Sequence, residues 1–242
     1  MTEDSVVRAI DHRLEAPILL RITFYRLPGA PMSEVLRVLI EQSLETMEGG
    51  RFQDFCLEFL PVYNTRFAGL SRVGHTAGGK TRAGTPDLLK ADSSGQTGVQ
   101  CGTDEDYWPT EDSIEGSKPF EDGMKCIRVL ELPGEIVLVT NRETPARTPN
   151  IKLLLATALQ SSTEARITIL GREDLSQFMI THLEDQSVRR LVSKFCPVAT
   201  MALEAGEHAE HLQVLGAVAE SRGWSAPQSS AHREELRVAA AR

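Results

Sequence analysis

The chain has 242 residues, with 26 Lys and Arg against 34 Asp and Glu, and a formal net charge of −8. This balance excludes a polybasic protein that binds nucleic acid through its overall charge, so any contact with nucleic acid must be local. The apolar share of 41% predicts a globular chain with one sizeable core and a small appendage.

The four cysteines lie far apart in the sequence and show no CxxC spacing. This spacing argues against a zinc site or a disulfide framework, and it predicts small core residues in a reducing, cytoplasmic environment. The N-terminal region is charged and its apolar run is short, so we expect no export signal and no association with a membrane.

Charge is distributed unevenly along the sequence. Residues 91–122 hold nine acids and a single base, Lys118, so this stretch carries the whole net charge. Residues 66–90 hold five bases and one acid, Asp87. A basic patch beside a carboxylate cluster is what a metal-dependent enzyme that cleaves phosphodiesters needs. Solvated surface charge is the commoner cause of such runs.

The first part of the chain predicts one extended segment and two helices. Residues 17–27 are expected to form a strand or a docking segment. Apolar residues then repeat at helical spacing over 35–47, and Gly49-Gly50 is the expected stop signal. The apolar face of residues 51–60 predicts a second helix, closed by Pro61.

Three short apolar runs follow, at residues 62–73, 85–90 and 97–103, and each predicts a strand. The Gly-rich segment between the first two, residues 74–81, matches the phosphate-loop pattern GxxxxGK[ST]. A phosphate loop needs a helix directly after it, and a glycine and Pro86 forbid that helix. We therefore interpret the segment as the loop of a hairpin.

The remainder alternates between helical and strand patterns and ends in a helical region. The expected elements are a helix in 118–132, a strand at 135–140, a helix at 151–160, a strand at 166–170, a helix at 173–185 and helical structure over 187–223. This order predicts an α/β fold with a mixed sheet flanked by helices on both faces.

Two polar residues stand out because they sit at the inner ends of consecutive predicted strands. Asp87 follows Pro86 at the start of one strand, and Gln100 lies in the sequence Val-Gln-Cys-Gly of the next. Neighbouring strands can place these side chains side by side, where Asp87 offers the hard oxygen that Mg²⁺ prefers. The simpler interpretation is that Pro-Asp only begins a strand and the carboxylate faces water.

At these residues the sequence resembles the PD-(D/E)xK nuclease superfamily, the restriction endonuclease-like fold, and within it the Mrr-like branch. Pro86-Asp87 looks like the PD motif, residues 99–102 like the branch's hydrophobic-Q-x-K strand, and residues 50–53 like its G-x-x-F-E helix opening. The resemblance implies a restriction endonuclease-like core over 49–185, preceded by an N-terminal segment and helix (1–48) and followed by a helical C-terminal region and tail (186–242).

The same resemblance implies a Mg²⁺-dependent (or Mn²⁺-dependent) DNA endonuclease, of a kind common among effectors of bacterial defence. Asp87 and Gln100 would hold the metal. Because the chain is acidic, we expect it to act with a protein partner or through self-association, for which the N-terminal and C-terminal segments are the surfaces to suspect.

Three positions depart from the family pattern. Gln53 stands where the family has Glu, Gln100 where most branches have an acid, and Gly102 where the catalytic Lys belongs. The nearest replacements for the Lys are Lys118, which we favour as the third catalytic residue, and Lys125. Asp54 and Glu58 are the acids nearest to position 53 that could compensate there, although a solvated helix face explains both better.

Two other interpretations remain open at this point. The departures favour a catalytically degenerate nuclease fold that serves as an interaction or scaffold subunit, and an unrelated α/β protein with a simple hairpin at 85–103 is the third possibility. Tyr107 and Trp108 either stack on a ligand or anchor their loop to the core. The paired histidines His208 and His211 are better explained by an exposed helix face than by a metal site.

Overall fold

The computed structural model describes residues 32–73, 86–93 and 95–221, with side chains in the last helix described as far as Ala209. The segment expected at 17–27 and the phosphate-loop pattern at 74–81 lie outside the described residues. Among the residues that are described, no helix has both the length and the apolar character that crossing a membrane requires.

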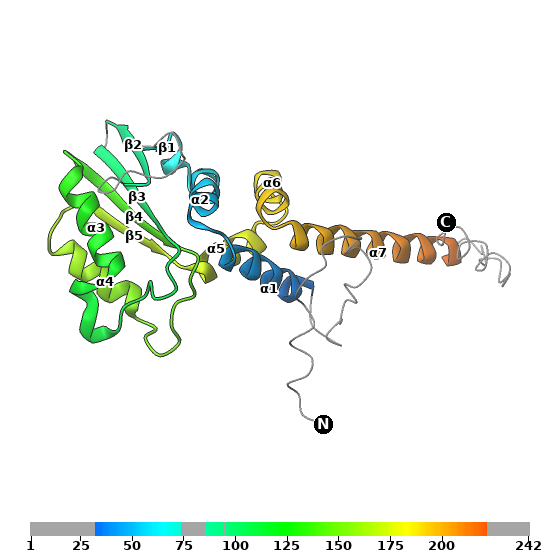
Figure 1. Ribbon diagram of the computed structural model, residues 1–242. Coiled ribbons are helices and arrows are strands. Elements are labelled where there is room, and N and C mark those ends of the chain that lie inside the picture. Colours follow the sequence, from blue (N-terminus) through cyan, green and yellow to red (C-terminus); the bar gives the residue numbers. More distant parts are fainter. Residues whose placement is uncertain (1–31, 74–85, 94, 222–242) are drawn as a thin grey trace, which may run out of the picture. The chain divides into compact units, whose positions relative to one another are not determined.

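A five-stranded mixed sheet forms the centre of the fold, with its strands in sequence order (Figure 1). The strands are β1 (Ser71–Arg72), β2 (Leu88–Asp92), β3 (Gly95–Gly102), β4 (Pro133–Thr140) and β5 (Arg166–Leu170). The first three strands pair antiparallel, whereas β3, β4 and β5 pair parallel. The α/β class with a mixed sheet is therefore as the sequence predicts.

Helices cover both faces of this sheet. On one face lie α3 (Lys118–Val129) and α4 (Ile151–Gln160), which connect the parallel strands. Against the other face lie α2 (Gly49–Tyr63) and α5 (Arg172–Thr181), with α1 (Met32–Glu45), α6 (Gln186–Phe195) and the first turns of α7 (Pro197–Ser221) packed on them. Two short 3-10 helices, η4 (Thr65–Phe67) and η5 (Glu111–Gly116), lie in connections.

The interior strand β4, which lies between β3 and β5, shows why the sheet needs two covers. Successive strand residues point to opposite faces, and all of the residues from Glu135 to Thr140 are buried. Ile136 and Leu138 pack with the residues of α3 and α4, whereas Val137 and Val139 pack with the opposite helices. A run that is apolar without alternation is typical of a parallel strand buried on both sides.

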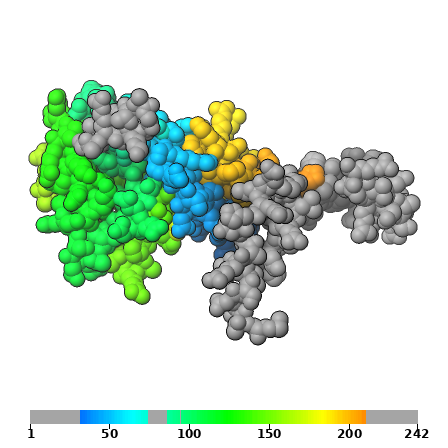
Figure 2. Space-filling view, in the orientation of Figure 1, coloured from blue at the N-terminus to red at the C-terminus, as the bar shows by residue number. Residues whose placement is uncertain are grey.

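A row of aromatic rings joins α2 to the C-terminal helices. Phe55 is fully buried, stacks on Phe52 and Phe59, and meets Phe195 of α6 edge-on at a centroid distance of 5.4 Å. The helices before and after the α/β region thus share one apolar cluster with the strands. The space-filling view shows the blue side chains of α1 and α2 adjoining the green elements of the sheet (Figure 2).

Asn141 links the end of β4 to the end of α1. Its side chain is completely buried, and its Nδ2 donates hydrogen bonds to the carbonyl oxygens of Leu44 and Met47 at 3.0 and 3.1 Å. The last carbonyls of a helix have no partner within the helix. Asn141 therefore adds a donor at the end of α1, where the Leu44 carbonyl also accepts from the backbone N–H of Met47.

Two local predictions were wrong. The first helix ends before Gly49 as expected, but α2 continues past Pro61 to Tyr63, because a proline in the last turn removes a single backbone donor. The expected strand at 62–73 shrinks to the two residues of β1. The Asn64 side chain accepts from the backbone N–H of Arg66 and starts a 3-10 turn, and Gly69, with φ of 88°, interrupts the extended chain.

Replacement of Phe55 by Ala is expected to destabilise the protein by about 3–5 kcal/mol, because it leaves a cavity among the three rings that contact it. Chemical unfolding monitored by circular dichroism measures this. Leu153→Ala is the matched control, since Leu153 is 66% exposed and its truncation should change stability by less than about 0.5 kcal/mol. Equal effects of the two substitutions would contradict the assigned core.

Candidate functional site

Asp87 lies directly before β2 and is 8% exposed. Its Oδ2 accepts a hydrogen bond from the backbone N–H of Cys101 on β3, and its Oδ1 accepts one from Gln53 Nε2 on α2, both at 2.8 Å. The backbone N–H of Asp87 also donates to the carbonyl of Val99. The Asp87 carboxylate is thus held between two strands and a helix, and these hydrogen bonds fix its orientation.

Gln100 is 7% exposed and lies on the face of β3 that packs against α3. Burial raises the pKa of the neighbouring Cys126 thiol to about 12, a hydrogen bond with Gln100 opposes this rise, and the charges of Asp122 and Asp87 add to it. The buried sulfur of Cys126 on α3 therefore interacts with Gln100 and with the charges of Asp122 and Asp87. The structure thus brings the predicted residues Asp87 and Gln100 into one neighbourhood, at the carboxyl end of β3.

The start of α3 adds a second buried carboxylate. Asp122 is 6% exposed, and its Oδ1 lies 2.8 Å from Lys125 Nζ and 3.5 Å from Lys118 Nζ. The hydrogen bond with Asp122 raises the pKa of Lys125, which keeps that ammonium charged. Lys118 is the first residue of α3, followed by Pro119 in the first turn, with its side chain 46% exposed.

Tyr107 occupies the space beside Gly102, where the family pattern places a lysine. A Cβ added to Gly102 would lie 2.0 Å from Tyr107 Cε2 and 2.4 Å from Cδ2, well inside contact distance. Tyr107 is 1% exposed. Burial, with smaller contributions from Asp122, Cys101 and Asp87, raises the pKa of its phenol, so it stays protonated.

The loop that carries Tyr107 is fastened to the end of β4. Arg142 Nε donates to the carbonyl of Thr103 at 3.1 Å, and Trp108 Nε1 donates to the carbonyl of Arg142 at 3.2 Å. Tyr107 and Trp108 meet edge-on at a centroid distance of 5.6 Å. Of the two roles considered for this aromatic pair, the structure gives Tyr107 that of a core anchor.

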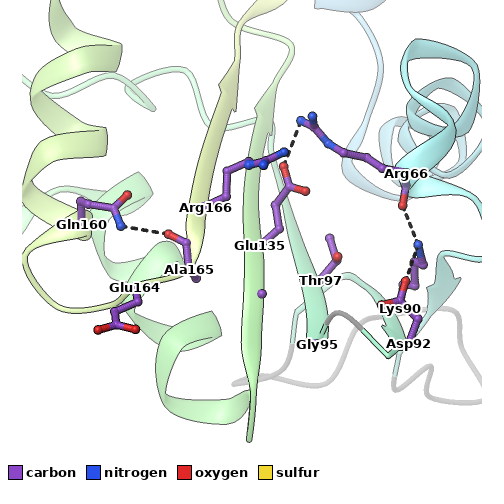
Figure 3. A pocket seen from close by; sticks show the side chains of 11 residues that line it. Arg66, Lys90, Asp92, Gly95, Thr97, Glu135, Gln160, Glu164, Ala165 and Arg166 are labelled. Carbon is purple, nitrogen blue, oxygen red and sulfur yellow. Dashed lines mark hydrogen bonds and ion pairs between the residues drawn. The ribbon is translucent and has the colours of Figure 1, made fainter.

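Two hollows of the described surface are not lined by Asp87, Gln100 or Asp122. One of about 650 Å³ sits at the opposite end of the sheet, where Lys90 bridges the carbonyl of Arg66 and the carboxylate of Asp92 (Figure 3). In this hollow the guanidinium of Arg66 lies 3.0 Å from the carboxylate of Glu135, so the charges that line the hollow largely neutralise one another. A smaller hollow of about 410 Å³ lies beside Trp108 and Arg142.

The acids expected to compensate for Gln53 are engaged on the surface. Asp54 pairs with Arg72 and Glu58 with Lys194, at side-chain exposures of 52% and 43%, so both belong to a solvated helix face. The buried residues of α3 include Asp122, Gly123 and Cys126, whereas Val129 is 47% exposed, because α3 packs against both β3 and α4.

Sequence reasoning missed Asp122 and the packing of Tyr107. Asp122 was counted among the acids of an exposed run, although lysines at i−4 and i+3 are a pattern that favours ion pairs on one helix face. Nothing in the sequence connects Tyr107 with Gly102, because their contact depends on how the intervening loop turns.

The oxygen donors of Asp87 and Gln100 are of the kind that Mg²⁺ binds. The described residues contain no group of three or more His, Cys, Asp or Glu side chains that could jointly hold a metal. Mg²⁺ needs fewer protein ligands than that, since it keeps several waters and binds through one or two carboxylates. The oriented Asp87 carboxylate with the amide oxygen of Gln100 fits this mode of binding.

No protein-family model matches this chain, and no curated protein or solved structure matches it either.

Replacement of Gly102 by Ala is expected to destabilise the protein, because the new Cβ meets the Tyr107 ring and the ring must move. We expect a loss of about 1–3 kcal/mol, measured by chemical unfolding. Gly50→Ala is the control, because a Cβ there meets nothing within 4 Å. A Gly102→Ala protein as stable as the original would show that Tyr107 does not pack on this strand.

Proposed function

We propose that this chain is a restriction endonuclease-like domain that cleaves DNA with Mg²⁺ or Mn²⁺. The observation that carries the proposal is the gathering of Asp87, Gln100 and Asp122, all less than 9% exposed, beside two lysines of α3. The motifs fall at α2, β2 and β3, followed by α3 and β4, and this order of helix, strand, strand, helix and strand is the one that the resemblance to this superfamily implies.

Burial is the physical reason to regard these carboxylates as functional. A buried carboxylate costs free energy unless hydrogen bonds or cations compensate for it. Asp87 takes a backbone donor and a glutamine, and Asp122 takes two ammonium groups. An apolar core needs neither residue, and ionisable groups held in this way concentrate at functional sites.

The chemistry assigned to the site is hydrolysis of a phosphodiester. The oxygen of a water forms a new bond to phosphorus, one ester P–O bond breaks, and the proton of the water passes to the leaving alkoxide. A bound metal would supply Lewis acidity at the phosphoryl group. Asp87 and Gln100 would hold that metal, and Lys118 would bring positive charge to the phosphoryl oxygens, where negative charge develops.

The charge of the chain bears on how DNA would reach this site. The stretch from 91 to 122 carries the whole net charge of −8 and includes the loop beside Gly102. Such a surface repels the DNA backbone at distances below the screening length. We therefore infer that DNA is presented by a protein partner or by a second copy of the chain, as suits an effector of bacterial defence.

Asp87→Ala is expected to lower cleavage of plasmid DNA by about a hundredfold or more, because it removes the carboxylate that would hold the metal. Plasmid nicking with Mg²⁺ or Mn²⁺ measures this. Asp112→Ala, in the exposed part of the acidic stretch, is the control and should cut normally. Substantial cleavage by the Asp87 variant would place the activity elsewhere.

Lys118→Ala is expected to reduce cleavage by about tenfold or more, whereas Lys125→Ala should have a smaller effect. Lys125 lies closer to Asp122, and we assign it to neutralising that carboxylate, while the more exposed Lys118 can turn toward a phosphate. The two variants are compared by their cleavage rates under the same conditions. Loss in Lys125→Ala alone would reverse the two roles.

A second candidate function is a catalytically degenerate member of the same fold that serves as a scaffold subunit. The specific observation in its favour is that Tyr107 fills the space where residue 102 would carry a lysine, while a neutral Gln53 faces Asp87. Titration calorimetry with Mn²⁺ separates the two functions. Binding that disappears in Asp87→Ala supports the nuclease, and absence of any binding supports the scaffold.

A further inference from the structure

A row of polar side chains crosses four strands at the end of the sheet opposite to the candidate site. Its members are paired in register across the sheet, and they are Lys90 of β2, Thr97 of β3, Glu135 of β4 and Arg166 of β5. Residues paired in this way lie side by side on one face of a sheet. The next paired row on the same face belongs to the apolar core, with Leu88, Val99 and Val137 fully buried.

All four residues of this row line the hollow of about 650 Å³ that Figure 3 shows. In that view the side chains of Arg66 and Arg166 reach toward Glu135 from two sides. Glu135 is 7% exposed, and its Oε1 lies 3.0 Å from Arg66 and accepts a hydrogen bond from the Thr168 hydroxyl at 2.8 Å. A buried ion pair is seldom more stable than apolar residues of the same volume. A buried carboxylate that lines an open hollow therefore points to a ligand.

Two charges of the hollow are left without an ionic partner. Besides the pair of Arg66 with Glu135, Lys90 lies 2.7 Å from Asp92. Arg166 and Glu164, which are both exposed at the beginning of β5, form no ion pair with any other described residue. One cation and one anion of the lining are thus available to a ligand.

The composition of the lining narrows the class of ligand. Three cations and three acids line the hollow, namely Arg66, Lys90 and Arg166 against Asp92, Glu135 and Glu164. A polyanion such as DNA gains little from this balance. No aromatic and no large apolar side chain is among the described residues of the lining, so a nucleobase finds no ring to stack on and a lipid chain no apolar wall. A small molecule with one anionic and one cationic group fits the two available charges.

We propose that this hollow binds a free amino acid, with the α-carboxylate of the ligand on Arg166 and its α-ammonium group on Glu164. A guanidinium group binds a carboxylate through two parallel hydrogen bonds, and a carboxylate accepts from an ammonium group. A volume of about 650 Å³ lies within the range usual for small-molecule sites. The site is separate from Asp87 and Gln100 and does not depend on the proposed nuclease function.

The experiment titrates the chain with each of the twenty standard L-amino acids in a calorimeter. We expect at least one of them to bind once per chain, with a dissociation constant below about 1 mM. The methyl ester of that amino acid lacks the anionic group, and its N-acetyl derivative lacks the cationic group. Each derivative should bind at least about tenfold more weakly, because each has lost one charge-assisted interaction.

Two variants assign these groups to their partners. Arg166→Gln and Glu164→Gln should each weaken binding of the amino acid by about tenfold or more. Arg166→Gln should not further weaken the methyl ester, and Glu164→Gln should not further weaken the N-acetyl derivative. Arg128→Gln, at an exposed position on α3, is the matched control and should bind with full affinity. Because the replaced side chains are exposed, the melting temperature of the free protein should not change.

Every contrary outcome counts against the site. Absence of binding by all twenty amino acids overturns the proposal, and so does undiminished binding by both variants, which would place the ligand elsewhere. A derivative that binds as tightly as its parent amino acid, or a loss of affinity in only one of the two variants, would show a site for a single charge and also overturns it. The comparison of derivatives uses the original protein, so it decides the question even if a variant fails to fold.

Discussion

The rest of the structure depends on the burial of β3 and β4 from both sides. A parallel strand with apolar residues on both faces, as in β4, can persist in water only if each face is covered. The helices α3 and α4 supply one cover, and α2 with the helices around it supplies the other. The cover that α3 supplies also brings Cys126 of this helix to Gln100.

Polar residues at the carboxyl end of β3 lie within a region that is otherwise apolar. Asp87 is reached by donors from α2 and from β3, so its position reports the packing of a helix against the sheet as well as the pairing of strands. Asp122 is reached by two lysines of its own helix. The two buried carboxylates are therefore compensated from different parts of the fold, Asp87 by neutral hydrogen-bond donors and Asp122 by ammonium groups, and a change at one need not disturb the other.

The sequence predicts most of the elements and fewer of their contacts. The strand at 135–140 and the helix at 151–160 follow from local apolar patterns and were confirmed. The strand predicted at 62–73 and the stop at Pro61 were wrong, because a single side-chain cap at Asn64 and the last turn of α2 outweighed the local signals. Local secondary-structure propensity is a weak predictor where a single hydrogen bond determines the path of the chain.

In the candidate site, too, the strands could be predicted from the sequence but not all of the contacts. The pairing of residues next to Asp87 with those next to Gln100 could be predicted from two strands joined by a short connection, and β2 and β3 do pair there. Asp122 and Tyr107 could not be predicted, since their burial depends on how α3 and the loop after β3 fold back on the sheet. The resemblance to nucleases directs attention to position 102 but cannot say what fills the space there.

The cap that Asn141 places on α1 has a practical consequence for dissecting the molecule. The carbonyls it binds belong to residues 44–47, almost a hundred positions earlier in the chain. A fragment that begins at α2 would keep every strand of the sheet yet leave the buried amide of Asn141, at the end of β4, without these acceptors. Fragments intended for expression should therefore retain the helix before residue 49, even when only the sheet is of interest.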